Sequence, residues 1–581
     1  MSKHVIILGG GVAGMSAANE LIERGFRVTV FEKQACIPGG KARSVDVPKT
    51  KTEQTRALPG EHGFRFFPGF YKHIIDTLKR IPYHTTEWKG SVYNNLVECE
   101  DIMMARIKQK TIYLPSHFPR SGRDLKMISD SIKILKSVLK PGELDLIGNK
   151  VWQLMTSCEL RRIHDYERLG WWEFTEASAY SEEYQSLFVN GLTRTLVAAK
   201  AETCNTKTNG NILLQMIFDL LNPFKQNDRI LNGPTNDVWL FPWLKYLKER
   251  GVEYFFNSEV VELSFDEREI NGVWVETDEK KVKYTADYYL CALPVERTAE
   301  LLSKNKEIFN LDKSLENILR LKDDVAWMNG IQFYLKKDVS INKGHIIMAD
   351  TPWALTAISQ AQYWTIDLKE YGNRKVEGII SVDVSNWEND GICIKKPADR
   401  CNEKEVVEEV WEQMKASLNK DGQILLDEAN LELVYVDGAI LFGDELHNNA
   451  GFLDSQMNEP SKYGSKGINH NEEPLLVNTT NSWALRNDAK TDIPNFFLAS
   501  DYVRSNTDLA TMEGANEAAR RAVNHIIDSS GVDASYCKIW KFKEPWWLCY
   551  YKWVDKRRFE RGLEWKVSKP WFASLLNLIL K

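Results

Sequence analysis

The sequence predicts an α/β fold: a Rossmann-like parallel sheet assembled from distant stretches, with a mixed-sheet and helical region inserted between them. The first stretch is an apolar strand, a glycine turn, a helix and a second strand, over residues 4–32. The second is residues 228–300, where short apolar strands surround an amphipathic helix. The third is a strand over 493–501, followed by an alanine-rich helix. Alternating strands and helices favour a parallel sheet with helical crossovers.

The first stretch carries the pattern of a dinucleotide-binding turn. An apolar strand over 4–8 leads into Gly9, Gly11 and Gly14, and a helix is predicted over 15–24. In this pattern the first glycine permits a tight turn, the second admits a pyrophosphate, and the third lets helix and strand pack closely. The helix N-terminus offers free N–H groups to phosphates. The residues predicted to contact a cofactor here are Gly9, Gly11, Val12, Ala13 and Gly14.

An acidic residue completes this unit at the end of the second predicted strand, over 26–31. Glu32 lies 18 residues after Gly14 and is followed by Lys33. A carboxylate at this place accepts hydrogen bonds from an adenosine ribose, which favours FAD or NAD over NADP. The alternative is a βαβ unit that binds no nucleotide.

A second glycine turn distinguishes FAD from NAD. Residues 38–44 hold two glycines that permit close backbone approach and two basic side chains that can reach phosphate or flavin oxygens. Taken alone, the segment is equally well read as a solvated loop. Together with the first turn it favours FAD, and the predicted contacts are Gly39, Gly40, Lys41, Ala42 and Arg43.

Composition sets limits on the class of protein. The chain has 581 residues, 43% hydrophobic and 27% charged, with a net charge of −6, enough for two or three domains and without the basic footprint of nucleic-acid binding. Its nine cysteines are scattered without a CxxC pair, so we expect no metal site and a reducing, cytoplasmic setting. The first apolar run is the nucleotide strand, so no signal peptide is expected. No run reaches the length of a membrane span.

The C-terminal residues 531–581 suggest contact with a membrane surface. Many of the 19 tryptophans fall here, interleaved with lysine and arginine, and residues 571–580 are mostly apolar. Aromatic rings among basic heads suit the interface of a bilayer, such as the inner face of the cytoplasmic membrane. The alternative, about equally favoured, is a helix docked on the protein's own surface.

Between the α/β stretches, apolar spacing predicts mostly helices over 120–225 and a sheet over 325–390. A helix is also predicted over 404–418, and residues 443–475 read as a long polar loop. An aromatic, glycine-punctuated segment, EHGFRFFPGFY, occupies residues 61–71 before a predicted helix at 72–80.

Several of these motifs together resemble the FAD-dependent amine oxidase and phytoene (carotenoid) desaturase superfamily. They are VIILGGGVAGMSAANEL, FEKQACIPGGKARS, EHGFRFF, NGPTNDVW, FFLASDY and TMEGANEAARRA. The chain is especially similar to bacterial phytoene-desaturase-like and hydroxysqualene-dehydroxylase-like flavoproteins. The resemblance implies a discontinuous FAD-binding domain and a substrate domain inserted twice. The implied boundaries are 1–75, 228–300 and 480–530 for the FAD domain, 76–227 and 301–479 for the substrate domain, and 531–581 for the tail.

The resemblance also assigns residues to the cofactor. Gly63, Phe64 and Arg65 would run near the isoalloxazine, and the backbone of Val260 would contact adenine. Asp501 would meet the ribityl-phosphate region and Met512 the flavin, and the implied set is completed by Ala292, Thr511 and Ala515. No cysteine lies in 499–513, so a covalent flavin link is not expected. Asn329 stands about where many amine oxidases place a lysine.

The implied chemistry is hydride transfer from a hydrophobic, isoprenoid or other lipid-like substrate to a non-covalently bound FAD. His62 is the best-placed proton acceptor, with a structural role equally open, and Arg65 is a candidate stabiliser of an anion or carbonyl. The alternatives are an amine oxidase that makes an imine and hydrogen peroxide, a redox-neutral FAD-dependent isomerase or hydratase, and a protein in which FAD is structural.

Overall fold

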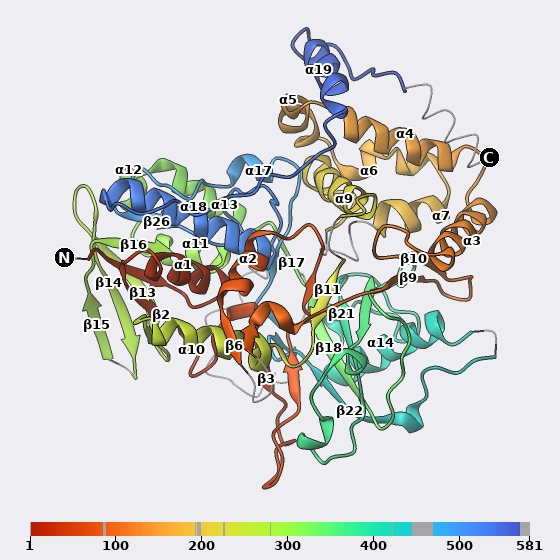
Figure 1. Ribbon diagram of the computed structural model, residues 1–581, viewed down its shortest axis with the longest axis horizontal. Coiled ribbons are helices and arrows are strands. Elements are labelled where there is room, and N and C mark those ends of the chain that lie inside the picture. The colour runs from red at the N-terminus through yellow and green to blue at the C-terminus, as the bar shows by residue number, and fades with distance from the viewer. Residues whose placement is uncertain are drawn as a thin grey trace.

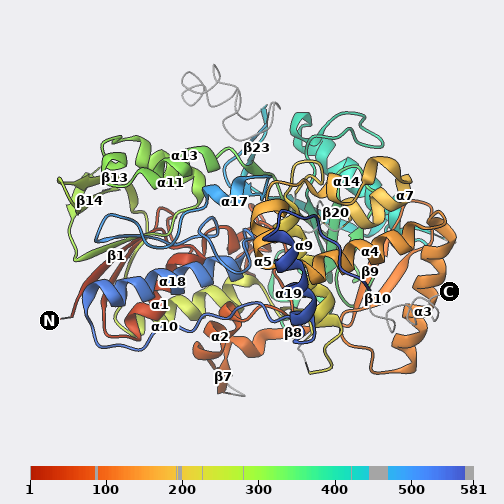
Figure 2. The ribbon, with the colours of Figure 1, turned by 90° about the horizontal axis from the view of Figure 1, so that it is seen from above.

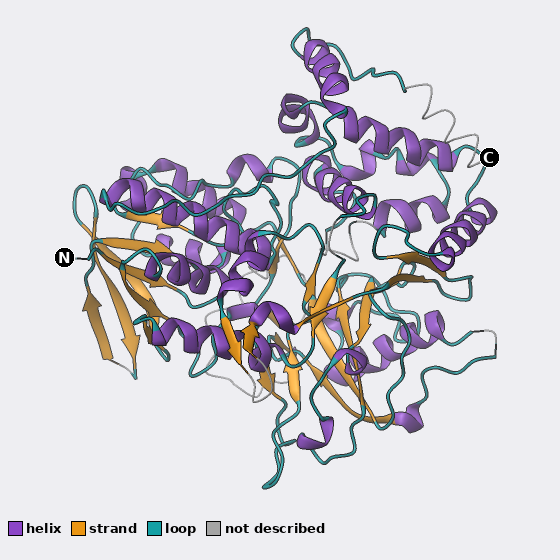
Figure 3. Cartoon of the chain, in the orientation of Figure 1, coloured by secondary structure: helices purple, strands orange, loops and turns teal. Residues whose placement is uncertain are grey.

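The computed structural model describes residues 2–84, 89–191, 193, 199–224, 227–278, 280–420, 422–443 and 469–569. Strands gather at the left and the lower centre of the molecule, and a group of helices lies at the upper right (Figure 3).

A five-stranded sheet unites the three distant α/β stretches (Figure 1). Its order is β12-β2-β1-β16-β26, and every neighbouring pair is parallel. The strands are β1 (His4–Leu8), β2 (Arg27–Phe31), β12 (Glu253–Phe255), β16 (Tyr288–Cys291) and β26 (Phe496–Leu498). The predicted α/β fold class with a Rossmann-like sheet is therefore confirmed.

Helices and a small sheet cover this parallel sheet (Figure 2). On one side α1, α10 and α18 lie together, and on the other α11 packs on a three-stranded antiparallel sheet of β13, β14 and β15. The helices are α1 (Val12–Ile22), α10 (Phe241–Glu249), α11 (Val295–Ser303) and α18 (Met512–Ser530). The small sheet is β13 (Glu259–Phe265), β14 (Ile270–Thr277) and β15 (Lys280–Tyr284).

Local chemistry explains where these elements depart from the predicted bounds. Helix α1 begins at Val12, because Gly11 has an extended backbone and serves as its N-cap. The amphipathic helix predicted within 228–300 starts with a π-helical turn over 236–240 before α10, which has a proline in its first turn. Strand β26 is shorter than the predicted 493–501 and begins only after Pro494 and Asn495.

A seven-stranded sheet forms the second body of the molecule. Its order is β10-β9-β19-β20-β21-β18-β22, with β9 and β19 parallel and the other neighbours antiparallel. Strands before and after the second α/β stretch thus share one sheet. They are β9 (Asp101–Ala105), β10 (Ile112–Pro115), β18 (Asn329–Leu335), β19 (Ile346–Met348), β20 (Leu355–Ser359), β21 (Gly378–Val384) and β22 (Leu431–Val436). Helix α14 (Glu403–Leu418) covers one face, where Trp411 meets Phe333.

The helical group at the upper right of Figure 1 includes α3 (Gly122–Val138), α4 (Glu143–Thr156) and α9 (Thr206–Leu220). The C-terminal helix α19 (Leu548–Phe559) packs on α4 and on α5 (Glu159–Arg161). It buries Leu548, and its fully buried Asp555 accepts a hydrogen bond from Arg161 Nε at 3.0 Å. The described part of the tail therefore docks on its own chain.

The outer surface of this docked tail keeps aromatic rings in solvent. Trp546 is 83% exposed and Trp553 is 53% exposed. The apolar end over 571–580, on which the membrane prediction also rests, lies outside the described residues. Within the described part of the chain, no helix combines the length and apolar character that a membrane crossing requires.

Candidate active site

A cavity of about 710 Å³ lies between the two large sheets. It begins at the carboxyl ends of β1, β2, β16 and β26, represented by Gly9, Glu32, Ala292 and Asp501. Ligands of open parallel sheets bind at this edge, because the following turns and helix N-termini converge there. The cavity then continues to the seven-stranded sheet, where it meets β9, β19, β20 and β21.

The structure brings nearly all of the predicted site residues to this cavity. Both candidate catalytic residues, His62 and Arg65, line it. So do the predicted cofactor contacts Gly9, Gly11, Val12, Ala13, Glu32, Lys33, Gly39, Gly40, Lys41, Ala42, Arg43, Gly63, Phe64, Val260, Ala292, Asp501, Thr511, Met512 and Ala515. Gly14 is not among the lining residues, and a Cβ placed on it would lie 2.0 Å from the Gly9 carbonyl oxygen. Its position fits close packing of α1 on β1.

The two glycine turns lie side by side. Gly39 donates a backbone hydrogen bond to the Gly10 carbonyl at 2.9 Å, and Gly11 forms a bridge with Gly39. Gly9 and Gly39 have φ values of 97° and 96°, a left-handed conformation that glycine adopts without strain. The pairing places both turns against the same end of the cavity.

Glu32 fixes the first turn from the end of β2. Its Oε2 accepts from the Gly10 N–H and its Oε1 from the Gln34 N–H, both at 2.8 Å. Burial raises the pKa of this carboxyl, while the two backbone hydrogen bonds oppose that shift. Each oxygen keeps a second lone pair, so a ribose hydroxyl can still donate to it.

The basic side chains of the second turn contact residues that the sequence did not single out. Arg43 donates to Glu473 Oε1 at 2.6 Å, and Lys41 donates to the Pro474 carbonyl. Burial opposes ionisation of Glu473, but the Arg43 charge holds its pKa below the ordinary value. Arg65 donates to the Ala42 carbonyl at 3.1 Å and to the Lys41 carbonyl at 2.8 Å. In this structure the Arg65 guanidinium therefore braces the second turn.

His62 is paired with a buried carboxylate. Its Nδ1 lies 2.6 Å from Asp437 Oδ2, which also accepts from Asn329 Nδ2 at 2.6 Å. Asn471 in turn donates to Asn329 Oδ1 at 2.8 Å. Burial opposes ionisation of Asp437, yet contact with His62 holds its pKa below the ordinary value. A carboxylate beside Nδ1 favours the neutral tautomer that carries its proton on Nδ1, which leaves Nε2 as the proton acceptor.

A transverse row of the seven-stranded sheet continues the polar lining. Thr356 on β20 lies opposite Asp383 on β21, which lies opposite Gly330 on β18. Gly330 donates to the His62 carbonyl at 2.6 Å, and a Cβ on it would come within 2.9 Å of Gly63. The absence of a side chain at Gly330 thus lets the His62–Gly63 backbone cross the sheet beside Asp383.

The remaining wall is mainly apolar. Helix α9 contributes Ile212, Leu213, Met216, Ile217 and Leu220, and the sheet contributes Ile102, Leu114 and Ile347. Such a wall suits a hydrocarbon chain.

The N-terminal part of the chain is similar to a known protein family. The family described as "NAD(P)-binding Rossmann-like domain" matches residues 7–81. Zeta-carotene desaturase from Synechocystis is 22% identical over 319 residues, which cover 52% of this chain and 60% of that protein. Bilirubin reductase from Mediterraneibacter gnavus is 45% identical over 56 residues, 10% of this chain and 9% of that protein. These matches span less than two thirds of either relative.

Solved structures extend the likeness across the chain. An oxidoreductase from Methanosarcina mazei has a TM-score of 0.56 at 13% identity, covering 90% of this chain and 100% of that one. Putrescine oxidase bound to putrescine has a TM-score of 0.55 at 11% identity, covering 91% of this chain and 99% of that one. Both likenesses lie below 25% identity, and they show that the chain shares the overall fold of these two oxidoreductases. The resemblance predicted from the sequence is confirmed.

The sequence reasoning missed five polar groups of the cavity region: Thr356, Asp383, His345, Asp437 and Glu473. A signal existed for two of them. Asp437 directly follows strand β22, the same pattern that identified Glu32 and Asp501. Asp383 is a charged residue inside a strand whose seven residues are all buried.

We expect ionisation of Asp383 to lower the free energy of unfolding as pH rises. Burial raises its pKa to about 7, well above the ordinary value of about 4. Between those values the folded chain binds more protons than the unfolded chain, so the free energy of unfolding falls with increasing pH and levels off above the folded pKa. Asp383→Asn should remove this contribution of Asp383 to the pH dependence of stability. The variant should gain stability relative to wild type by up to about 4 kcal/mol from pH ~4 to pH ~8. Parallel profiles of melting temperature against pH would contradict the expectation.

Proposed function

We propose that this protein is an FAD-dependent oxidoreductase, a dehydrogenase or desaturase that removes a hydride from a hydrophobic, isoprenoid or other lipid-like substrate. The observation that carries the proposal is the continuity of the cavity. Its first half is built from two glycine turns and the acidic ends of parallel strands, and its second half has the apolar wall of α9. Such a cavity suits a long dinucleotide cofactor with a hydrophobic substrate at its far end.

The residues of the first half fit FAD. A Cβ on Gly11 would have only the Gly40 Cα, at 3.9 Å, within contact distance, so open space for a pyrophosphate adjoins the turn. Glu32 would hold the adenosine ribose, Val260 the adenine and Asp501 the ribityl-phosphate region. The N-terminus of α18, at Met512, adds its dipole. We propose non-covalent binding, since residues 499–513 contain no cysteine.

In this proposal bound FAD supplies the hydride acceptor, and the chain positions the substrate and handles protons. The apolar side chains of α9 orient the substrate and exclude water. His62 accepts a proton at Nε2, and Asp437 stabilises the resulting imidazolium through Nδ1. Arg65 has a positioning role, since it holds the turn that contains Lys41 and Ala42.

The first test is the cofactor itself. The purified protein should show flavin absorbance in the visible range, and mild denaturation should release intact FAD, identified by chromatography and mass spectrometry. A lipid substrate should bleach that absorbance under anaerobic conditions. A flavin-free preparation that also fails to bind added FAD would overturn the proposal. Peroxide release from amines, without reduction by any lipid, would favour the amine oxidase alternative instead.

A further inference from the structure

Three buried polar side chains in the substrate half of the cavity have unused hydrogen-bonding atoms. Within the described part of the chain, Thr356 Oγ1, Asp383 Oδ1 and His345 Nε2 have no hydrogen-bond partner. The three residues are 0%, 5% and 7% exposed, and all three line the cavity. Buried polar atoms in folded proteins are usually paired, so three unpaired atoms gathered on one cavity wall form a candidate binding site for a polar group.

The sheet register places these atoms on a single face. Thr356 lies opposite Asp383 across β20 and β21, and opposite Ile347 across β19 and β20. Residues directly opposite in an antiparallel pair point to the same side. His345 is two residues before Ile347, so strand alternation gives it that side as well. The His345 ring also packs against Phe64 and Phe66, with centroid separations of 5.5 and 5.1 Å.

The charge of this group favours a neutral ligand. Burial lowers the pKa of His345 to about 4, so the ring is uncharged at neutral pH. The Arg65 guanidinium near Asp383 already donates to the Ala42 and Lys41 carbonyls, so it is not dedicated to a substrate carboxylate. Burial also disfavours the ionised form of Asp383 that an ammonium ligand would need. Asp383 is faced by Arg65, Glu61 and His62, whose charges partly offset one another.

We propose that Asp383, Thr356 and His345 bind a hydroxyl or carbonyl oxygen carried by the substrate. A hydroxyl donates one hydrogen bond and accepts others, which matches a carboxyl, a threonine hydroxyl and a neutral imidazole. The substrate class is then an oxygenated lipid, with its apolar chain along α9 and its oxygen at the β20–β21 row. This inference deepens the proposed function and rests on it for the apolar part of the site.

The test compares four ligands of equal chain length: labelled 1-dodecanol, dodecanal, dodecane and dodecylamine. Their binding to the full-length protein is measured by equilibrium dialysis in the same detergent. We expect the alcohol or aldehyde to bind at least about ten-fold more tightly than the alkane or the amine. The alkane leaves the site groups unpaired, and the charged amine loses its hydration without an ionised carboxylate to pair with. Thr356→Val, which keeps the side-chain shape, should reduce that preference about five-fold. Asp383→Leu should remove most of it, while Asp383→Asn, which can still donate and accept, should retain more.

The matched control is Ile347→Ala, next to Thr356 in the same row. It should weaken alcohol and alkane together and leave their ratio unchanged, because it removes only apolar contact. Equal binding of dodecanol and dodecane by the wild type, or tighter binding of dodecylamine, would overturn the inference. So would an unchanged preference in a folded Thr356→Val variant.

These readouts do not require flavin. A flavin-free protein that still prefers dodecanol would contradict the proposed function and support the binding of a substrate oxygen by Asp383, Thr356 and His345. A flavoprotein without the preference would do the reverse.

Discussion

Substitution of Gly11 by valine should abolish retention of FAD and leave the protein folded, whereas Gly14→Ala should damage the fold itself. At Gly11 the backbone is extended, and the nearest atom to a new Cβ is the Gly40 Cα at 3.9 Å. A side chain therefore fits the protein but fills the space that a pyrophosphate would need. At Gly14 a Cβ would lie 2.0 Å from the Gly9 carbonyl oxygen, which belongs to the backbone. Helix α1 would have to move off β1.

The two variants separate cofactor binding from folding. Gly11→Val should lose the visible flavin absorbance after gel filtration and melt within a few degrees of wild-type protein freed of cofactor. Gly14→Ala should melt much lower, in line with a loss of about 3 kcal/mol or more for overpacking against backbone. Gly25→Ala is a useful control for glycine replacement, because it lies outside the cavity and no atom lies within 4 Å of its Cβ. Its φ of 82° is left-handed, so this control should lose about 1–2 kcal/mol from backbone strain alone, without steric overlap. Full flavin content in Gly11→Val would place the pyrophosphate elsewhere.

The glycine-turn half of the cavity could be predicted from the sequence because its signals are local. Gly9, Gly11 and Glu32 belong to one strand–turn–helix–strand unit, in which spacing alone dictates geometry. Asp501 was found by the same logic, as an acid that follows a buried strand. The neighbouring Gly39–Arg43 turn was ambiguous by itself, and became informative only next to the first unit.

The substrate half depends on pairings that spacing does not encode. The position of Asp383 beside Gly63 follows from the register of β18 against β21 and from the absent side chain at Gly330. The partner of His62, Asp437, is more than 300 residues away in the chain. Strand pairing of this range is fixed by tertiary packing, so a sequence pattern predicts that a strand exists but not which residues it faces.

The C-terminal tail, residues 531–581, is a second case in which the sequence could not identify the surface that a segment contacts. Its aromatic and basic composition was compatible with a membrane surface and with docking on the protein itself. Buried contacts such as the Asp555–Arg161 hydrogen bond show that the described part packs on α4 and α5. Composition indicates which kinds of surface a segment can bind, whereas a specific buried ion pair identifies the surface that it does bind.

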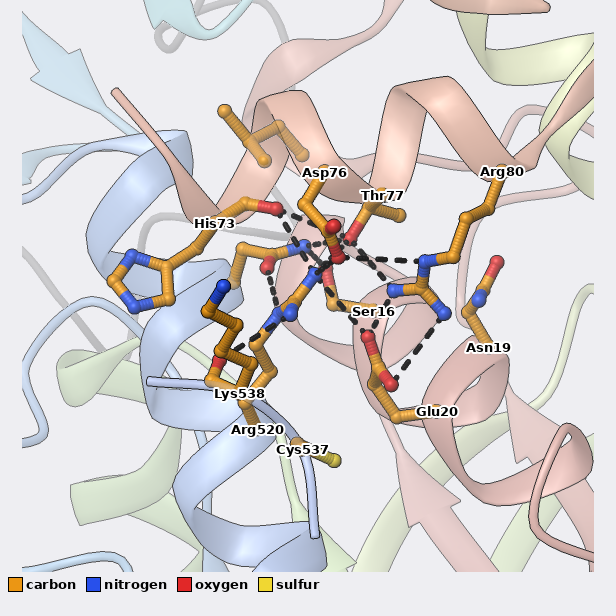
Figure 4. A network of polar contacts seen from close by, with 12 residues as sticks. Ser16, Asn19, Glu20, His73, Asp76, Thr77, Arg80, Arg520, Cys537 and Lys538 are labelled. Carbon is orange, nitrogen blue, oxygen red and sulfur yellow. Dashed lines mark hydrogen bonds and ion pairs between the residues drawn. The ribbon is translucent and has the colours of Figure 1, made fainter. Parts of the chain in front are cut away.

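Removal of Arg520 should produce a large loss of stability, because it lies in a buried polar network that joins α1, α18 and α2 (His73–Arg80) (Figure 4). Its guanidinium lies 3.2 Å from Glu20 and 2.7 Å from Asp76, and it donates to the His73 carbonyl at 3.0 Å. The Arg520 and Glu20 side chains are 2% and 1% exposed. Arg520→Met should cost about 3–5 kcal/mol, since a buried carboxylate loses one of its cations.

The pH dependence of the Arg520→Met variant should identify Glu20 as the carboxylate that is destabilised when Arg520 is removed. Burial opposes ionisation of Glu20, but Arg520 and Arg80 together hold its pKa below the ordinary value. This carboxylate therefore contributes stability above its unfolded pKa and loses it as pH falls. Without Arg520, protonation of Glu20 costs less, so the deficit of Arg520→Met should be largest near neutral pH and shrink toward pH ~4. Glu20→Gln combined with Arg520→Met should be less destabilising than the sum of the single changes.

An exposed ion pair supplies the control for this network. Arg27 lies 3.1 Å from Glu253, with side chains 56% and 45% exposed. Arg27→Met should change stability by about 1 kcal/mol or less, because solvent screens the pair and both ends remain hydrated without it. If Arg520→Met melted like Arg27→Met, or if its deficit were the same at every pH, the network would not couple the three helices. The opposite result would show that the helices around the nucleotide turn are held together by charge as well as by apolar packing.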